Sequence, residues 1–143
     1  MKKKSVQKTG AHHNSLVEGE YSFKGKHFIA SYLDCDEIAI RNIEVLKKQF
    51  QEAVKASYAT ILEVAEFVFA PDGLTMVLLL SESHASIHTY PERRACFVDL
   101  FTCGEKCQSS AFDTILRNCL KPAKVSWCEL LRSDRIEAVP FVQ

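Results

Sequence analysis

The sequence predicts an α+β fold, a two-layer αβ sandwich in which an antiparallel-rich sheet carries two helices on one face. Two observations carry this prediction. Short runs rich in β-branched and aromatic residues alternate with two amphipathic segments, and turn-forming residues separate several of the strand-like runs. The length of 143 residues is also usual for one domain with one hydrophobic core.

Residues 1–22 are polar and lack periodicity, so we expect a flexible N-terminal arm before a single domain over residues 23–143. Lys and Arg number 18, as do Asp and Glu, so net charge gives no reason to expect a nucleic-acid partner. No run approaches the roughly 18 apolar residues of a membrane span, and no export signal follows the initial lysines. With six unpatterned cysteines, we expect a cytoplasmic protein whose thiols stay reduced.

In the first half of the domain, residues 28–33 have the β-branched and aromatic content of a strand. Residues 36–57 follow as a helix, and residues 60–69 as a strand that ends in the turn-forming residues 70–73. Residues 74–80 return as a strand whose nearly unbroken apolar character predicts burial on both faces, with a dimer partner as one possible cover. The helix is predicted from apolar residues at three- and four-residue steps, namely Ile43, Leu46, Phe50 and Val54.

In the second half, residues 86–90 and 95–101 form two more short strand-like runs. Residues 105–120 carry a single apolar stripe and stop before a proline, which predicts a second helix. Residues 124–131 are the last predicted strand, and we expect the tail after them to be loose.

A dense set of reactive side chains follows the most apolar strand, in residues 81–92 and 99–104. One interpretation is a zinc site in which Cys103, Cys107, His84 and His88 provide the four ligands of a tetrahedral centre. The segment that holds the histidines is strand-like, however, and residues four apart on a strand are about 13 Å apart. The spacing therefore disfavours zinc, and we expect no metal.

A second interpretation is a hydrolase in which Cys103 is the nucleophile, His88 the base and Asp99 the residue that orients the base. The sequence does not exclude this arrangement. Each of these residues taken alone is more often structural than catalytic, and only their density in one place favours a functional site.

The run Leu80–Glu92, followed by Asp99–Gly104, resembles the signature of the S-adenosylmethionine decarboxylases of the short bacterial and archaeal type. The similarity begins near Gly25 and extends through the last predicted strand, which is about four fifths of the chain. Members of this family are proenzymes that generate their own pyruvoyl cofactor. The resemblance implies the same fold and chemistry here.

The resemblance implies that the chain breaks between Glu82 and Ser83, which yields residues 1–82 and 83–143 as two chains of one folded unit. The Ser83 hydroxyl would attack the preceding carbonyl to form an ester. His88 would then accept the α-proton, and elimination and hydrolysis would leave a pyruvoyl group derived from Ser83. That group would hold the substrate as a Schiff base while carbon dioxide leaves.

The resemblance also assigns the supporting residues. Thr75 occupies the position of a hydroxyl residue that assists processing, and Cys103 that of the proton donor, a role that suits a thiol because thiols are mostly protonated at neutral pH. Phe69 would stack on adenine and Glu92 would accept hydrogen bonds from the ribose hydroxyls. Tyr90 departs from the family pattern, which has Trp at this position.

The implied product supplies aminopropyl groups for spermidine and polyamine biosynthesis, and the implied partner is a second processed copy in a homodimer with sites at the interface. Two alternatives remain open on the sequence. One is a pyruvoyl-dependent decarboxylase of arginine or ornithine, since the chemistry needs only an α-amino acid. The other is a relative that is not processed and only binds or regulates a partner.

Overall fold

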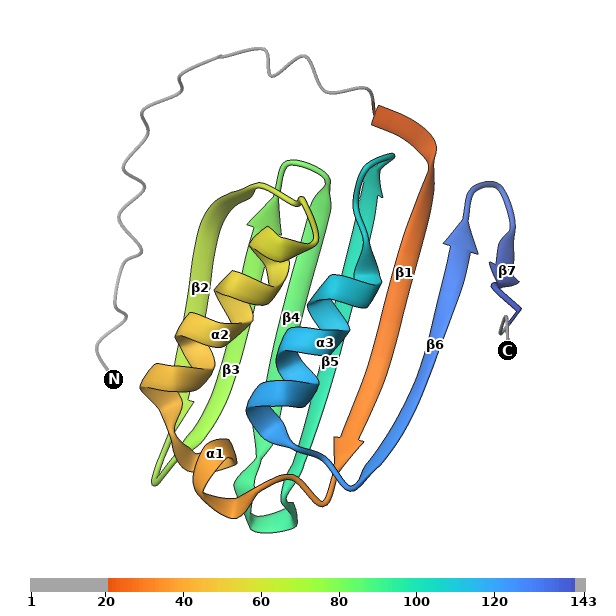
Figure 1. Ribbon diagram of the computed structural model, residues 1–143. Helices are drawn as coiled ribbons and strands as arrows, with labels where there is room; N and C mark the ends of the chain where they lie inside the picture. The colour runs from red at the N-terminus through yellow and green to blue at the C-terminus, as the bar shows by residue number, and fades with distance from the viewer. Residues whose placement is uncertain (1–20, 141–143) are drawn as a thin grey trace, which may run out of the picture.

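The computed structural model describes residues 21–140, in which helices pack on one face of a seven-stranded sheet (Figure 1). The strands are β1 (Tyr21–Leu33), β2 (Ile61–Phe69), β3 (Gly73–Leu80), β4 (Ser83–Tyr90), β5 (Ala95–Gly104), β6 (Lys124–Arg132) and β7 (Ile136–Ala138). The helices are α1 (Glu37–Arg41), α2 (Ile43–Ala56) and α3 (Ser109–Leu120), with a 3₁₀ turn η1 (Pro91–Arg93) between β4 and β5. None of the helices in residues 21–140 is long and apolar enough to cross a membrane.

The strand order across the sheet is β2-β3-β4-β5-β1-β6-β7, and every neighbouring pair is antiparallel. β2 to β5 follow one another as hairpins, whereas β1 inserts between β5 and β6 (Figure 1). This insertion places His27 of β1 opposite Phe101 of β5. Side chains more than 70 residues apart in sequence therefore become neighbours in the sheet.

The hydrophobic core lies between the sheet and the two longer helices (Figure 1). Phe112 of α3 is fully buried, and its ring lies 6.0 Å from that of Phe50 on α2 and 6.0 Å from that of Phe28 on β1. Burial alternates along β3 and β5, as it does when one face of a strand packs on a core. The helical layer is thus fixed to one face of the sheet, which we call the covered face.

The other face, which we call the open face, has no second layer within the described residues. Val77 and Leu79 of β3 point to it and are 39% and 53% exposed, while Met76 and Leu78, which alternate with them, are buried. The expected burial of this strand on both faces is therefore not achieved within one chain. A continuous apolar run obeys the twofold alternation of the strand, and only every second side chain meets the helices.

The predicted fold class is confirmed, with one difference in the helical layer. The helix expected over residues 36–57 is divided at Asn42, whose side chain accepts a hydrogen bond from the Val45 N–H while its own backbone N–H donates to Ala39. Asn42 therefore ends α1 and caps α2 at the same point. The presence of an asparagine inside the periodic segment was the one feature of the sequence that could have indicated this break.

Two further expectations about the ends of the domain differ from the structure. The tail expected to be loose forms β7, which pairs with β6 from Ile136 to Ala138. β1 begins at Tyr21, so the last two residues of the predicted arm belong to the sheet. The rest of the predicted arm lies outside the described residues. Local composition did not indicate β7 because its stability comes from pairing with β6.

Candidate active site

The first group of reactive side chains lies at the turn between β3 and β4. The backbone carbonyl of Glu82 accepts a hydrogen bond of 2.8 Å from the N–H of Cys103, and its carboxylate accepts one of 3.0 Å from the N–H of Thr60. Ser83 follows with a φ of 150°, a conformation that residues with a side chain rarely adopt and that stores backbone strain. The Glu82–Ser83 peptide is thus held on its carbonyl side and strained on the other.

Cys103 lies beside this peptide, near the end of β5. Its Sγ is 3.5 Å from the Oγ of Ser83, and both residues are half-buried. Gly25 of β1 leaves room for the Phe101 ring beside Cys103, because a Cβ there would lie 2.9 Å from the Cζ of Phe101 and 3.4 Å from the Cys103 Sγ. A hydroxyl, a thiol and a polarised carbonyl therefore meet at one point, which we call the cleavage group.

A second group of predicted site residues lies at the other end of β4. Thr75 and His88 are opposite each other on β3 and β4, and the Thr75 Oγ1 is 3.1 Å from the His88 Nδ1. They border a hollow of about 420 Å³ at the connection between β4 and β5. Of the predicted residues, those that line it are Phe69, Thr75, His88, Tyr90 and Glu92.

We call these five residues the pocket group, and aromatic rings form much of its wall. Phe69 is 52% exposed and its ring lies 4.7 Å from that of Phe67, while the ring of Tyr90 lies 5.3 Å from that of Phe97. Glu92 stands in the 3₁₀ turn that closes the hollow. The aromatic faces can pack on a planar ring or attract a cation, and the carboxylate can accept hydrogen bonds.

The two groups occupy opposite ends of the same strand. Ser83 and His88 are five residues apart on β4, which at about 3.3 Å per residue separates them by about 16 Å. Direct proton transfer needs heavy atoms about 3 Å apart. Within one chain, the histidine of the pocket group therefore does not reach the serine of the cleavage group.

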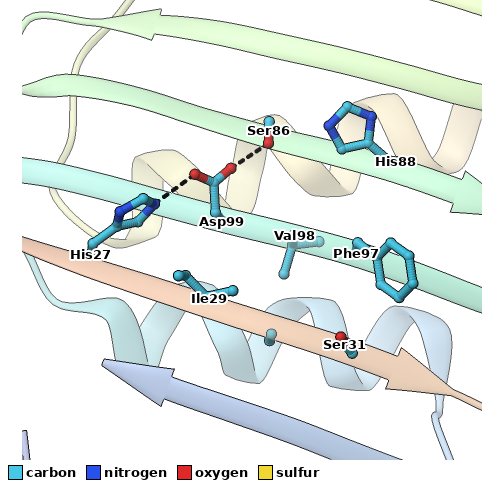
Figure 2. Close-up of a pocket in the computed structure, with 9 residues that line it drawn as sticks. His27, Ile29, Ser31, Ser86, His88, Phe97, Val98 and Asp99 are labelled. Atoms are coloured by element: carbon cyan, nitrogen blue, oxygen red, sulfur yellow. Dashed lines mark hydrogen bonds and ion pairs between the residues drawn. The ribbon is translucent and has the colours of Figure 1, made fainter. Parts of the chain in front are cut away.

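A hollow of about 450 Å³ lies on the open face across β4, β5 and β1. Figure 2 shows Asp99 between His27 and Ser86 at one end of it, and His88 and Phe97 at the other. Both His88 of the pocket group and the side chains next to the cleavage group therefore face this side of the sheet. The open face, rather than the covered one, carries the candidate chemistry.

Asp99 makes side-chain contacts that the sequence did not reveal. His27 donates to its Oδ2 over 2.7 Å, the His84 Nε2 is 3.3 Å from the same oxygen, and Ser86 donates to Oδ1. Burial by itself raises the pKa of Asp99, but the hydrogen bonds from Ser86 and His27 and the nearby imidazoles outweigh it, so that the pKa lies below its usual value. In the sequence, His27 is marked only by its position at the start of a strand-like run, and this position does not show that its side chain contacts Asp99.

The structure does not assemble the two alternative sites considered from the sequence. In the proposed hydrolase, Asp99 would orient His88, but Asp99 contacts His27, His84 and Ser86, and His88 contacts Thr75. The four proposed zinc ligands do not form a group within residues 21–140, where the cluster with metal-ligand spacing is His27, His84 and Asp99. Cys107 is instead buried, with its thiol directed at the Tyr58 carbonyl, and burial raises its pKa.

Comparison with known proteins identifies the family. Residues 26–133 match the family model of S-adenosylmethionine decarboxylase. The chain belongs to the S-adenosylmethionine decarboxylase family. The matched residues run from the middle of β1 to just beyond β6, and so include both the cleavage group and the pocket group.

Curated relatives and a crystal structure agree with this family. The chain is 37% identical over 113 residues to an S-adenosylmethionine decarboxylase proenzyme of Methanococcus aeolicus, a match that covers 79% of this chain and 97% of the relative. It is 41% identical to the proenzyme of Brevibacillus brevis over 79% of this chain and 85% of the relative. The crystal structure of the adenosylmethionine decarboxylase from Aquifex aeolicus aligns with a TM-score of 0.67 and 29% identity, over 76% of this chain and 88% of that one.

Membership of the S-adenosylmethionine decarboxylase family favours an enzyme over a binding module, because the relatives carry the names of enzymes. It also favours S-adenosylmethionine over a basic amino acid as the substrate class to be tested. The relatives are named proenzymes, and in this chain the strained Glu82–Ser83 peptide is the candidate for a processing site.

Proposed function

We propose that this chain is a self-processing decarboxylase that cleaves itself between Glu82 and Ser83 and then decarboxylates S-adenosylmethionine. The observation that carries the proposal is the cleavage group, in which a strained serine, a hydrogen-bonded carbonyl and a thiol meet at one peptide. The product would supply aminopropyl groups for spermidine and polyamine biosynthesis. The six cysteines are all free thiols, which suits the reducing cytoplasm as the place of action.

The cleavage step uses groups already in place. The N–H of Cys103 withdraws electron density from the Glu82 carbonyl and is aligned to stabilise negative charge on that oxygen. The Ser83 hydroxyl would attack the carbonyl carbon and its proton would pass to the Ser83 nitrogen, so that an ester replaces the peptide bond. The strain at Ser83 favours this change because the ester releases a backbone that is held at a φ of 150°. The two parts would stay joined through this ester until a base removes the α-proton of residue 83 and the Glu82 carboxylate leaves by elimination.

After cleavage, residue 83 is the site of the pyruvoyl group, whose ketone holds the substrate amine and withdraws electrons as carbon dioxide leaves. The surroundings of Ser83 fit such a group, because its side chain is half-buried and lies against the thiol of Cys103. Cys103 lies 3.5 Å from Ser83 Oγ, so its thiol is placed to donate a proton to a carbon bound there. His88, whose Nδ1 lies 3.1 Å from the Thr75 hydroxyl, would be the proton acceptor in processing.

The pocket group would bind the nucleoside part of the substrate. Phe69 offers an exposed ring for adenine, and Glu92 offers a carboxylate for the ribose hydroxyls. Tyr90 and Phe97 add aromatic faces that attract a sulfonium cation. Arginine or ornithine would leave the adenine surface of Phe69 unused, which favours S-adenosylmethionine.

We further propose that the working unit is a homodimer in which the open faces of two copies pack together. The separation of about 16 Å between Ser83 and His88 supports this, since one chain does not close the site alone. A twofold axis through the open face would place the cleavage group of one copy on the pocket group of the other. Several apolar side chains are exposed on that face and would be buried, among them Ile29, Val77, Leu79 and Phe97.

The proposal is tested on the full chain in two stages. Mass spectrometry after incubation should find two fragments that meet at Glu82–Ser83, with a pyruvoyl group at the start of the second. Release of carbon dioxide is then measured with S-adenosylmethionine, arginine and ornithine, and only the first should be consumed. One intact chain after long incubation would indicate a binding protein, and preferential use of arginine or ornithine would overturn the substrate assignment.

A Cys103→Ala variant separates the roles within the cleavage group. Its Ser83 hydroxyl and the backbone N–H of residue 103 remain, so the chain should still be cut. Without the thiol, turnover should divert to inactivation of the cofactor because the proton reaches the wrong atom. Decarboxylation at the wild-type rate would show that Cys103 is not the proton donor.

A further inference from the structure

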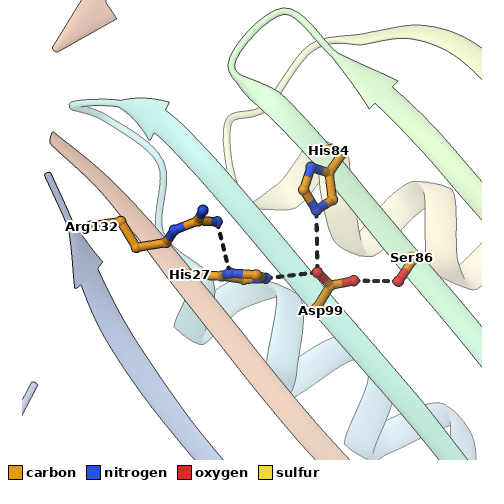
Figure 3. A network of polar contacts seen from close by, with 5 residues as sticks. All are labelled: His27, His84, Ser86, Asp99 and Arg132. Atoms are coloured by element: carbon orange, nitrogen blue, oxygen red, sulfur yellow. Dashed lines mark hydrogen bonds and ion pairs between the residues drawn. The ribbon is translucent and has the colours of Figure 1, made fainter. Parts of the chain in front are cut away.

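One carboxylate on the open face joins three strands. Figure 3 shows Asp99 of β5 at the centre, with His27 of β1 on one side and His84 and Ser86 of β4 on the other. The side chain of Asp99 is 20% exposed, so these charge-assisted contacts are less weakened by water than they are at a surface. Within the candidate site this cluster has no part in the chemistry assigned to Ser83, His88 and Cys103.

The protons in the cluster are fixed by its outermost member. Arg132 of β6 places its Nη1 3.3 Å from the Nδ1 of His27 (Figure 3). A guanidinium only donates, so this Nδ1 accepts and the Nε2 of His27 carries the hydrogen that is given to Asp99. Arg132 also stacks over the Phe101 ring, 4.4 Å from its centroid, which holds the arginine in position. The contacts therefore form a directed series from Arg132 through His27 to Asp99.

The cluster acts on the segment next to the cleavage bond. His84 directly follows Ser83, and Ser86 is two residues further along the same strand. Both side chains bind the one carboxylate of Asp99, so the first residues of β4 are attached to β5 through side chains as well as through the backbone ladder. The His84 ring also packs on Phe101, 5.6 Å between centroids, two residues before Cys103 on β5.

This attachment gains importance once the chain is cut. In the intact chain, β3 and the Glu82 carbonyl hold Ser83 from one side. After cleavage residue 83 is a chain end, and strand ends fray unless they are tied down. The reactive group must nevertheless stay within about 3.5 Å of the Cys103 thiol, the separation seen for Ser83 Oγ.

We propose that Asp99 is a positioning residue that clamps the new start of β4 through His84 and Ser86, and so keeps the group at position 83 beside Cys103. The inference rests on the proposed function. His27 and Arg132 fix the orientation of the carboxylate, and Asp99 does not itself touch the reacting atoms. Accurate placement of the proton donor decides whether a proton reaches the substrate carbon or a carbon of the cofactor.

His27, His84 and Asp99 also have the composition of a metal site with two histidines and one carboxylate, and their ligand atoms lie within 4.8 Å of one another. The direction of the hydrogen bonds opposes that use. A metal would need the lone pair of His27 Nε2, but Arg132 requires that nitrogen to carry hydrogen. We therefore assign the cluster a positioning role.

The experiment compares processed wild type with Asp99→Asn and measures the number of turnovers completed per inactivated site. Asparagine keeps the shape but removes the negative charge, so the hydrogen bonds from His27 and His84 are no longer charge-assisted and the attachment of β4 is weakened. We expect the number of turnovers per inactivation to fall by about tenfold or more, because small misplacements of reacting groups cause losses of this size. Ser86→Ala, which removes one of the two β4 contacts, should change the ratio in the same direction by a smaller factor.

Asp113→Asn is the matched control. Asp113 on α3 is 17% exposed and accepts hydrogen bonds from Tyr32 and Arg117, but it lies in the helical layer away from the open face. It should lower the melting temperature and leave the turnover ratio unchanged. The proposal is overturned if Asp99→Asn and Ser86→Ala keep the wild-type ratio, or if Asp113→Asn lowers it equally.

Two further measurements distinguish the proposed clamp from a folding defect and from a metal site. If Asp99→Asn fails to fold or to be cut, Ser86→Ala alone decides the matter by the same ratio. A chelator should leave cleavage and turnover of the wild type unchanged, and a loss restored by a divalent metal would replace the clamp with a metal site. Failure of the wild type to be cut would instead overturn the proposed function itself, an outcome visible before any variant is made.

Discussion

The division of the site between two copies predicts complementation between inactive variants. Ser83→Ala removes the cleavage group's nucleophile, and His88→Ala removes the histidine of the pocket group. Each variant alone should remain uncut. In a mixed dimer, however, one site combines the intact Ser83 of one chain with the intact His88 of the other, so the His88→Ala chain should be cut.

The expected magnitude follows from the geometry. Ser83 and His88 of one chain are about 16 Å apart along β4, against about 3 Å for proton transfer, so rescue within a chain is excluded by distance. Random pairing of equal amounts places about half of the His88→Ala chains in mixed dimers, so about half of them should be cut. The Ser83→Ala chain should never be cut, because it lacks the hydroxyl.

The assay uses the two full-length variants co-expressed with different tags, with cleavage of each followed by gel and mass spectrometry. Ser83→Ala mixed with Cys103→Ala is the control, because both changes lie in the cleavage group and no mixed site is complete. That pair should recover no decarboxylation, whereas Ser83→Ala with His88→Ala should recover it. Mixed dimers that form, as shown by capture through one tag, but contain no cut His88→Ala chain would refute the composite site.

Three other predictions test the site and the fold. Gly25→Ala should lower kcat by about tenfold or more, because its Cβ would clash with the Phe101 ring and force β5 to shift two residues before Cys103, the proton donor. An unchanged kcat would show that the position of the donor tolerates this shift. Phe112→Ala should lower the free energy of unfolding, measured in urea, by about 3–5 kcal/mol, because the ring is fully buried between α2 and β1. A loss well below this range would mean that the core closes around the gap. The pKa of Asp99 in the folded protein lies below its unfolded value of about 3.9. Its contribution to the free energy of unfolding is therefore fully present above about pH 3.9 and disappears as the pH falls through the folded pKa. Urea unfolding at a series of acidic pH values should therefore show a steeper loss of stability for wild type than for Asp99→Asn, and parallel curves would contradict the lowered pKa.

Much of the fold could be predicted from local patterns. The twofold pattern of strands such as β1 and the helical pattern of α2 and α3 are local properties, and turn-forming residues mark the β2–β3 hairpin. The helix break at Asn42 and the strand β7 were missed. A cap in a continuous periodic segment and a three-residue strand depend on hydrogen bonds to neighbours that the local sequence does not specify.

The sequence by itself determined the chemistry to be sought, because Glu82, Ser83 and His88 stand in one contiguous motif with Cys103 shortly after it. Only the tertiary structure decided how these groups are distributed. An extended strand carries Ser83 and His88 to opposite ends of the sheet, while the antiparallel pairing of β4 with β5 brings Ser83 to Cys103. The insertion of β1 beside β5 likewise brings His27 to Asp99 across 72 residues, a contact set by strand order and register rather than by any local pattern.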